Sequence, residues 1–137
     1  MNVHEQRGEG VHGERVLLVD DEEAFRETMA RALERRGLVV RCAESGEQCL
    51  EELAAREFDV VVLDLEMPGM RGLAALPEIA RRWPLVSVIV LTGHGTLARG
   101  IQAMKAHAFD FLSKPVMADE LVPVILAAVH GRVERTG

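Results

Sequence analysis

Five polar side chains in this sequence have the chemistry to handle a divalent metal ion and a phosphate group. They stand at or just beyond the ends of four apolar runs of the chain: Asp20, Asp21, Asp64, Thr92 and Lys114. Three carboxylates brought together repel one another, and their pKa values rise unless a cation compensates. Mg²⁺ prefers oxygen ligands and typically takes one or two protein carboxylates, which leaves positions for phosphate oxygens. With Mg²⁺ and Lys114 present, the positive charges would balance the carboxylates.

A carboxylate is also a phosphoryl nucleophile, since it forms an aspartyl phosphate. Lys114 and the hydroxyl of Thr92 are suited to bind phosphoryl oxygens, and in-line transfer needs mostly positioning and charge neutralisation. The residues alone therefore suggest metal-assisted phosphoryl transfer to an aspartate. The plainer alternative is that Asp20 and Asp21 cap the following helix, because acidic residues favour helix starts. Capping and metal binding are compatible with each other.

Five short apolar runs predict the strands that carry these residues. Three of them are nearly continuous in Val, Leu and Ile, which is typical of strands covered on both faces, as in parallel sheets. The runs span residues 16–19, 38–40, 60–63, 86–91 and 109–112. In such a sheet, functional groups gather just beyond the carboxyl ends of the strands.

Segments with helical spacing lie between and after these runs. The first carries Phe25, Met29 and Leu33 and ends at Gly37, a plausible glycine just past a helix end. The second opens at a capping box formed by Ser45 and Gln48. The others are predicted at 73–83, around 101–105, and at 119–133. Strand and helix thus alternate five times, which predicts an α/β fold, a doubly wound parallel five-stranded sheet with helices on both faces.

Four motifs make the chain similar to the receiver domain of two-component response regulators. They are VLLVDDE, DVVVLDLEMPGMRGL, VIVLTGHG and FDFLSKP, in that order, and the likeness covers about residues 15–134. The residues of these motifs most resemble those of receivers in sigma-54-dependent regulators. The resemblance implies a flavodoxin-like (βα)5 fold with strand order 2-1-3-4-5. It also implies a cis peptide bond between Lys114 and Pro115.

The resemblance assigns a role to each residue of the site. Asp64 would accept a phosphoryl group from a sensor histidine kinase or a phosphotransfer protein. The metal, Mg²⁺, would be held by Asp20, Asp21, Asp64 and the backbone carbonyl of Glu66. Thr92 and Lys114 would bind phosphoryl oxygens.

The resemblance also implies how phosphorylation is read out. Phe111 would be the switch residue, turning inward as Thr92 moves toward the phosphate. The signal would then appear on the surface of the fourth helix, fifth strand and fifth helix, where a downstream protein or a second copy of the chain would bind. Glu66 and His94 stand two residues past Asp64 and Thr92, and we expect them to tune the lifetime of the phosphoryl group.

Three departures from the family pattern stand out. Arg71 occupies a place where the family commonly has an acid, and His107 a place where glycine often precedes the Ala-Phe-Asp sequence. Pro123 falls inside the fifth predicted helix. Unless that helix begins late, Pro123 removes one helical hydrogen bond and kinks it, which puts the usual dimer geometry in doubt.

Composition bounds the function. With 137 residues and a net charge of −6, the chain predicts one domain and argues against a surface built to grip nucleic-acid phosphates. No apolar run is long enough for a membrane span, so we expect a cytoplasmic protein. Residues 1–14 read as a flexible lead-in, and no output domain is expected. Cys42 and Cys49 have no metal-binding or redox spacing and read as ordinary thiols.

The main reading is a phosphorylation-activated receiver that catalyses only its own phosphorylation and dephosphorylation. One alternative is a receiver excised from a longer sigma-54-dependent regulator. Another is a phosphatase with Asp64 as nucleophile, which would usually need a second aspartate where Glu66 stands. A nucleotide-binding module is disfavoured because the acidic DDEEAF follows the first strand in place of a glycine-rich loop.

Overall fold

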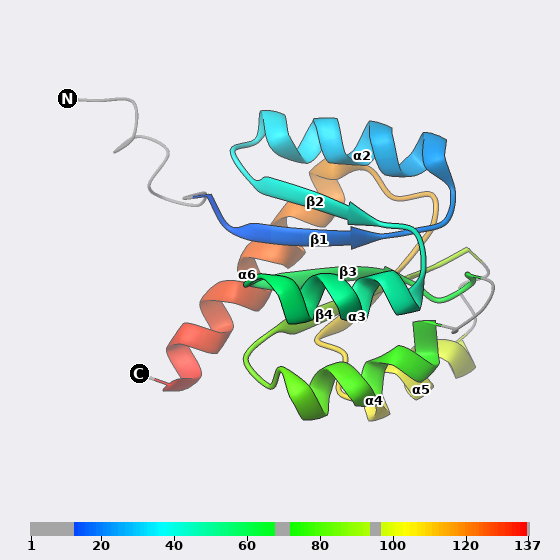
Figure 1. The fold of residues 1–137 in the computed structure, drawn as a ribbon, viewed down its shortest axis with the longest axis vertical. Coiled ribbons are helices and arrows are strands. Elements are labelled where there is room, and N and C mark those ends of the chain that lie inside the picture. The colour runs from blue at the N-terminus through cyan, green and yellow to red at the C-terminus, as the bar shows by residue number, and fades with distance from the viewer. Residues whose placement is uncertain (1–12, 68–71, 94–96, 137) are drawn as a thin grey trace.

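Five parallel strands form a single sheet in the computed structural model, which describes residues 13–67, 72–93 and 97–136. The order across the sheet is β2-β1-β3-β4-β5 (Figure 1). The strands are β1 (Arg15–Val19), β2 (Val39–Ala43), β3 (Val60–Asp64), β4 (Ser87–Thr92) and β5 (Asp110–Ser113). The doubly wound α/β fold and the strand order expected from the sequence are therefore confirmed.

Helices alternate with the strands and are numbered from α2, as in Figure 1. They are α2 (Glu23–Arg35), α3 (Gly46–Ala55), α4 (Gly72–Arg82), α5 (Leu97–Lys105) and α6 (Ala118–Thr136). Helices α2 and α6 cover one face of the sheet, and α3, α4 and α5 cover the other (Figure 1). None of the helices in the described segments is long and apolar enough to cross a membrane.

Alternating side chains of the strands feed two separate cores. Along β1, Leu17 and Val19 pack with α3, α4 and α5, whereas Val16 and Leu18 pack with α2 and α6. This is the period of two that a strand imposes on its side chains. Because both faces are covered, β3 is buried at every position, which explains the continuous apolar runs.

The edge strand β2 runs three residues beyond its apolar run. Its register with β1 continues through Cys42 and Ala43, although Arg41 interrupts the apolar pattern. An edge strand has an exposed side, so a charged residue is tolerated there. Arg41 uses that position to form an ion pair with Glu52 of α3.

Two helix ends follow the sequence signals. Gly37 has a φ of +94°, and the N–H groups of Gly37 and Leu38 donate to carbonyls of the last turn of α2, so Gly37 closes that helix as expected. At the start of α3, the Ser45 hydroxyl accepts a hydrogen bond from the Gln48 N–H. The return bond to the Gln48 side chain comes from the Glu44 N–H, one residue earlier than in the usual capping box.

His107 occupies the same kind of position as Gly37, just past the end of α5, and its φ is +77°. The His107 N–H donates to Met104 and the Ala108 N–H to Ala103, which completes the turn. A side chain disfavours the left-handed region, so His107 holds a conformation that a glycine would adopt more easily.

Pro123 lies inside α6, which begins at Ala118 rather than later. Because the helix begins before Pro123, that residue removes one helical hydrogen bond. Pro123 is on the exposed side of the helix, while Leu121 and Ile125 point into the core. Pro123 disturbs the packing of α6 little, because the neighbouring apolar residues Leu121, Val122 and Ile125 remain buried.

Helix α5 meets β5 at an unusually close contact between Gly100 and the ring of Phe111. A Cβ atom built on Gly100 would lie 2.3 Å from Phe111 Cζ, a distance no real contact allows. The ring is partly buried and packs on the core under α4 and α5. Gly100 therefore provides the space in which the Phe111 ring lies.

We expect Gly100→Ala to destabilise the protein by about 1–3 kcal/mol, because the added methyl overpacks the contact. In a Phe111→Ala background the same change should be neutral or stabilising, since alanine is the better helix former. Urea unfolding of the four proteins in this double-mutant cycle measures the coupling. An equal cost of Gly100→Ala in both backgrounds would show that the ring does not occupy this space.

Candidate functional site

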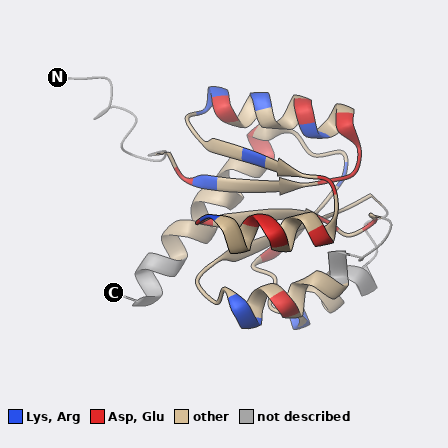
Figure 2. Cartoon of the chain, viewed as in Figure 1, with Lys and Arg blue, Asp and Glu red and all other residues tan. Residues whose placement is uncertain are grey.

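The register of the sheet brings the acidic residues together at its carboxyl edge. Val19 of β1 pairs with Leu63 of β3, so Asp20 and Asp64 are the next residues along two adjacent strands. Neighbouring strands lie about 4.8 Å apart, which places both side chains within reach of one cation. Figure 2 shows that the connection from β1 to α2, at this edge, is acidic.

One oxygen from each of Asp20, Asp21 and Asp64 lies within 4.8 Å of the others. Asp20 and Asp64 are buried, whereas Asp21 is exposed. Burial raises the pKa of the Asp64 carboxyl above its ordinary value, and the charges of Asp20 and Asp21 raise it further. The hydrogen bond from the Glu66 N–H and the charge of Lys114 oppose this rise only in part.

Lys114 is the cation that the structure places inside this cluster. Its Nζ atom lies 2.6 Å from Asp20 Oδ2 and 3.7 Å from Asp64 Oδ2. Burial alone would lower the pKa of Lys114, but its hydrogen bond with Asp20 and the nearby carboxylates outweigh burial, so the pKa is raised. The peptide bond from Lys114 to Pro115 is cis, as expected.

Two Asp side chains also organise the loops that follow their strands. Asp20 Oδ1 accepts a hydrogen bond from the Glu22 N–H at 2.9 Å, and Asp64 Oδ1 accepts one from the Glu66 N–H at 3.0 Å. The residue that caps α2 is Glu22, and its side chain makes no capping hydrogen bond. Neither Asp20 nor Asp21 is therefore the capping residue of α2, and Asp20 makes a hydrogen bond within the loop before that helix.

Thr92 ends β4 next to this cluster and is fully buried. Its hydroxyl donates to Glu66 Oε2 at 3.2 Å, and the N–H of Gly93 donates to Glu66 Oε1 at 3.1 Å. The loop after β3 is held beside β4 by the Leu65 N–H, which donates to the Leu91 carbonyl. The structure therefore brings Thr92 and Glu66 into direct contact.

The structure adds residues for which the sequence analysis predicts no role at the site. The ring of Phe25 lies 4.3 Å from Lys114 Nζ, a cation–π arrangement that helps to hold the lysine. Arg26 donates to the Asp20 carbonyl at 2.8 Å. Gly93, the glycine after Thr92 in the LTGHG motif, donates its N–H to Glu66. His94 and Arg71 lie outside the described residues.

The donor set fits a divalent metal ion. Carboxylate oxygens are the ligands that hard cations prefer. Among the described residues, Lys114 is the cation that pairs with these carboxylates, and its charge of +1 offsets their charge of −3 in part. A dication would neutralise the remainder. The arrangement can therefore bind a divalent ion and place a nucleophilic carboxylate, a hydroxyl and an ammonium group around one phosphoryl group.

Comparison with known proteins agrees with this site. Residues 16–126 match the response regulator receiver domain family. The DNA-binding transcriptional regulator NtrC of Escherichia coli (strain K12) is 40% identical over 114 residues, which is 83% of this chain. The chain spans about a quarter of the length of that relative, 24%.

Two solved structures show the same fold. A receiver domain protein from Clostridium thermocellum is 35% identical with a TM-score of 0.83, over 89% of this chain and 98% of the other. A response regulator from Burkholderia pseudomallei, with a phosphorylated aspartic acid, a calcium ion and citrate, is 31% identical with a TM-score of 0.79. That match covers 89% of this chain and 72% of the other.

The match to the family covers most of the chain, and the relatives include the sigma-54-dependent regulators whose receivers its motifs resemble. Receiver domains are phosphoacceptor switches that bind a divalent metal at an acidic pocket. This chain belongs to the receiver domain family of two-component response regulators.

Proposed function

We propose that Asp64 is the phosphoacceptor of this receiver and that the donor is a phosphohistidine on a sensor histidine kinase or a phosphotransfer protein. The observation that carries the proposal is the buried Asp64 carboxylate, 3.7 Å from Lys114 and grouped with Asp20 and Asp21. In the reaction the nitrogen–phosphorus bond of the donor breaks and an oxygen–phosphorus bond to Asp64 forms. The histidine leaves with its electron pair and takes up a proton from solvent.

Each neighbour of Asp64 has a role in this proposal. Asp20, Asp21 and Asp64 would hold Mg²⁺ together with the backbone carbonyl of Glu66. When bound, the ion neutralises charge on the phosphoryl oxygens and on the carboxylates. Lys114 would pair with one phosphoryl oxygen and the Thr92 hydroxyl with another, so that charge is balanced as the group arrives.

The signal would leave the site through Phe111. Phosphorylation of Asp64 adds about one negative charge and oxygen acceptors that draw Thr92. Phe111 lies on β5, the strand that pairs with the strand of Thr92. In that pairing Val90 is opposite Phe111 and Thr92 is opposite Ser113. Its ring lies on Gly100 of α5, which links the site to the surface of α5, β5 and α6. Ile101 and Met104 of α5 are exposed there and would meet a downstream protein or a second copy of the chain.

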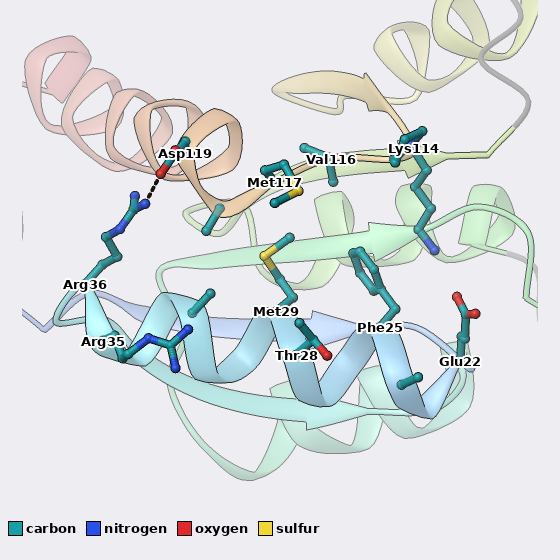
Figure 3. Close-up of a pocket in the computed structure, with 14 residues that line it drawn as sticks. Glu22, Phe25, Thr28, Met29, Arg35, Arg36, Lys114, Val116, Met117 and Asp119 are labelled. Atoms are coloured by element: carbon teal, nitrogen blue, oxygen red, sulfur yellow. Dashed lines mark hydrogen bonds and ion pairs between the residues drawn. The ribbon is translucent and has the colours of Figure 1, made fainter.

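A groove beside the site supports docking of the phosphodonor. Its volume is about 800 Å³, and it runs between α2 and the loop from β5 to α6 (Figure 3). Lys114 stands at one end, and the ion pair between Arg36 and Asp119 stands at the other (Figure 3). Its apolar lining comes mainly from Phe25, Met29, Val116 and Met117.

Because the groove adjoins Lys114, the occupant that we propose is the protein that carries the phosphohistidine. A phosphohistidine must reach Asp64, so its protein has to cover surface next to Lys114. A helix that presents the histidine and an apolar stripe would fill the groove while the histidine meets the site. Burial of the apolar lining of the groove by that helix would contribute to the free energy of binding.

The cytoplasm is the compartment that fits this proposal. Cys42 and Cys49 are both free, which suits a reducing environment. Burial raises the pKa of Cys49 to about 12, so that thiol is unreactive. The chain's acidic balance supports protein partners rather than direct contact with nucleic acid.

The phosphoacceptor is tested with a small donor. Incubation with Mg²⁺ and acetyl phosphate should add about 80 Da to the intact protein, the mass of one phosphoryl group. Asp64→Asn should show no addition, because the amide is not a phosphoryl nucleophile. Mass spectrometry of the intact protein measures both. A wild type that binds metal but gains no mass would contradict the proposal.

The metal site is tested by thermal unfolding with and without Mg²⁺. At a Mg²⁺ concentration of 100 times its Kd, the wild type should gain about 2.7 kcal/mol of stability. Asp21→Asn should lose most of that gain. Without metal it should be at least as stable as the wild type, because one repelling charge is gone. Glu22→Gln, an exposed neighbour, is the control and should keep the gain. An unchanged gain in Asp21→Asn would remove Asp21 from the ligands.

The groove is tested by comparing two kinds of donor. Met117 is 67% exposed, so Met117→Glu should leave the fold intact but place a charge in the groove. Transfer from a phosphorylated sensor kinase that phosphorylates the wild type should slow about tenfold or more, while the rate with acetyl phosphate stays unchanged. Leu85→Glu is a matched control, since Leu85 is 65% exposed and lies outside the groove. Equal kinase rates for all three proteins would place docking elsewhere.

A further inference from the structure

Glu66 reaches from the loop after β3 to the end of β4, where its carboxylate receives two hydrogen bonds. The Thr92 hydroxyl donates to one carboxylate oxygen, and the Gly93 N–H donates to the other. A hydroxyl and a backbone N–H aimed at two oxygens of one anion form an anion-binding pair. In this structure the anion that occupies the pair belongs to the chain itself.

The backbone holds Glu66 in this position. Its N–H donates to Asp64 Oδ1 at 3.0 Å, so the residue is tied to the proposed phosphoacceptor. A Cβ built on Gly93 would lie 2.9 Å from Glu66 Oε1, so any larger residue at 93 would crowd the carboxylate. Glycine at this place therefore permits the close approach.

The side chain of Glu66 is nevertheless free to leave. Residue 66 is exposed, while Thr92 is fully buried. The hydroxyl stays within the site, whereas the carboxylate can turn to solvent without breaking a core contact. The contact is thus a reversible occupation of a fixed pair of donors.

We infer that Glu66 is an internal competitor of the phosphoryl group, occupying the Thr92 and Gly93 donors until a phosphoryl group on Asp64 displaces it. This inference rests on the proposed function of Asp64. It goes further by assigning to the Glu66 side chain control over how tightly the site binds a phosphoryl-like anion. The competition acts through the Thr92 hydroxyl, not only through the general negative charge of the site.

The probe for this inference is beryllofluoride, a phosphoryl analogue, titrated calorimetrically into the protein at saturating Mg²⁺. We expect Glu66→Ala to bind it about five- to tenfold more tightly, since the competing hydrogen bonds are gone. Glu66→Gln should gain less, because its amide oxygen still accepts from Thr92. Glu22→Gln removes one nearby charge without touching Thr92 and should change the affinity less than about twofold.

Thr92→Val keeps the shape of the side chain and removes its hydroxyl, so this variant tests whether Glu66 acts through that hydroxyl. In a Thr92→Val background, Glu66→Ala should yield a much smaller gain than in the wild type. A second readout is the amide resonance of Gly93, which Glu66→Ala should shift in the free protein but not in the beryllofluoride complex. There the analogue, not Glu66, accepts the hydrogen bond in both proteins.

The outcomes separate this inference from the function on which it rests. Equal beryllofluoride affinities of wild type and Glu66→Ala, with acetyl phosphate still modifying Asp64, would overturn the competition and leave the phosphoacceptor in place. A Gly93 amide unmoved by Glu66→Ala would do the same. Failure of both beryllofluoride binding and acetyl phosphate modification would overturn the phosphoacceptor and the competition together.

Discussion

The ion pair between Lys114 and Asp20 is the interaction on which the site depends. Asp20 is fully buried, and a buried carboxylate is costly unless it is paired and hydrogen-bonded. Lys114 follows the edge strand β5, whereas Asp20 follows β1. The ion pair therefore ties the loop after β1 to the loop after β5. The pair still leaves the three carboxylates with an excess negative charge, and that excess makes the edge a receptor for a dication.

The parts of the fold that obey local rules were predictable from the sequence. The continuous apolar runs predicted buried parallel strands, and Gly37 and Ser45 predicted helix ends that the structure confirms. The edge strand was less predictable, because Arg41 interrupts its apolar run and only pairing with β1 extends it. Acidic residues at the strand ends pointed to one site because parallel strands end at one edge. Asp20, Asp21 and Asp64 do lie together at that edge.

What the sequence could not predict are contacts that depend on side-chain reach between elements. Nothing in the letters LTGHG indicates that Gly93 donates to Glu66, because that contact needs the loops after β3 and β4 to lie side by side. Likewise, Gly100 resembles any small residue in a helix until the ring of Phe111 is seen against it. In both places a glycine marks where another residue approaches closely, which is a tertiary fact. One contact lies at the Thr92 and Gly93 donors, and the other connects β5 to α5.

The most direct test of the account is chemical identification of the phosphorylated residue. Borohydride reduces an aspartyl phosphate to homoserine, so a kinase-phosphorylated sample can be reduced, digested and sequenced by mass spectrometry. The account predicts homoserine at position 64, formed only when Mg²⁺ was present during phosphorylation. Homoserine at another aspartate, or a phosphorylated protein that yields none, would contradict the assignment of Asp64 as the residue that receives the signal.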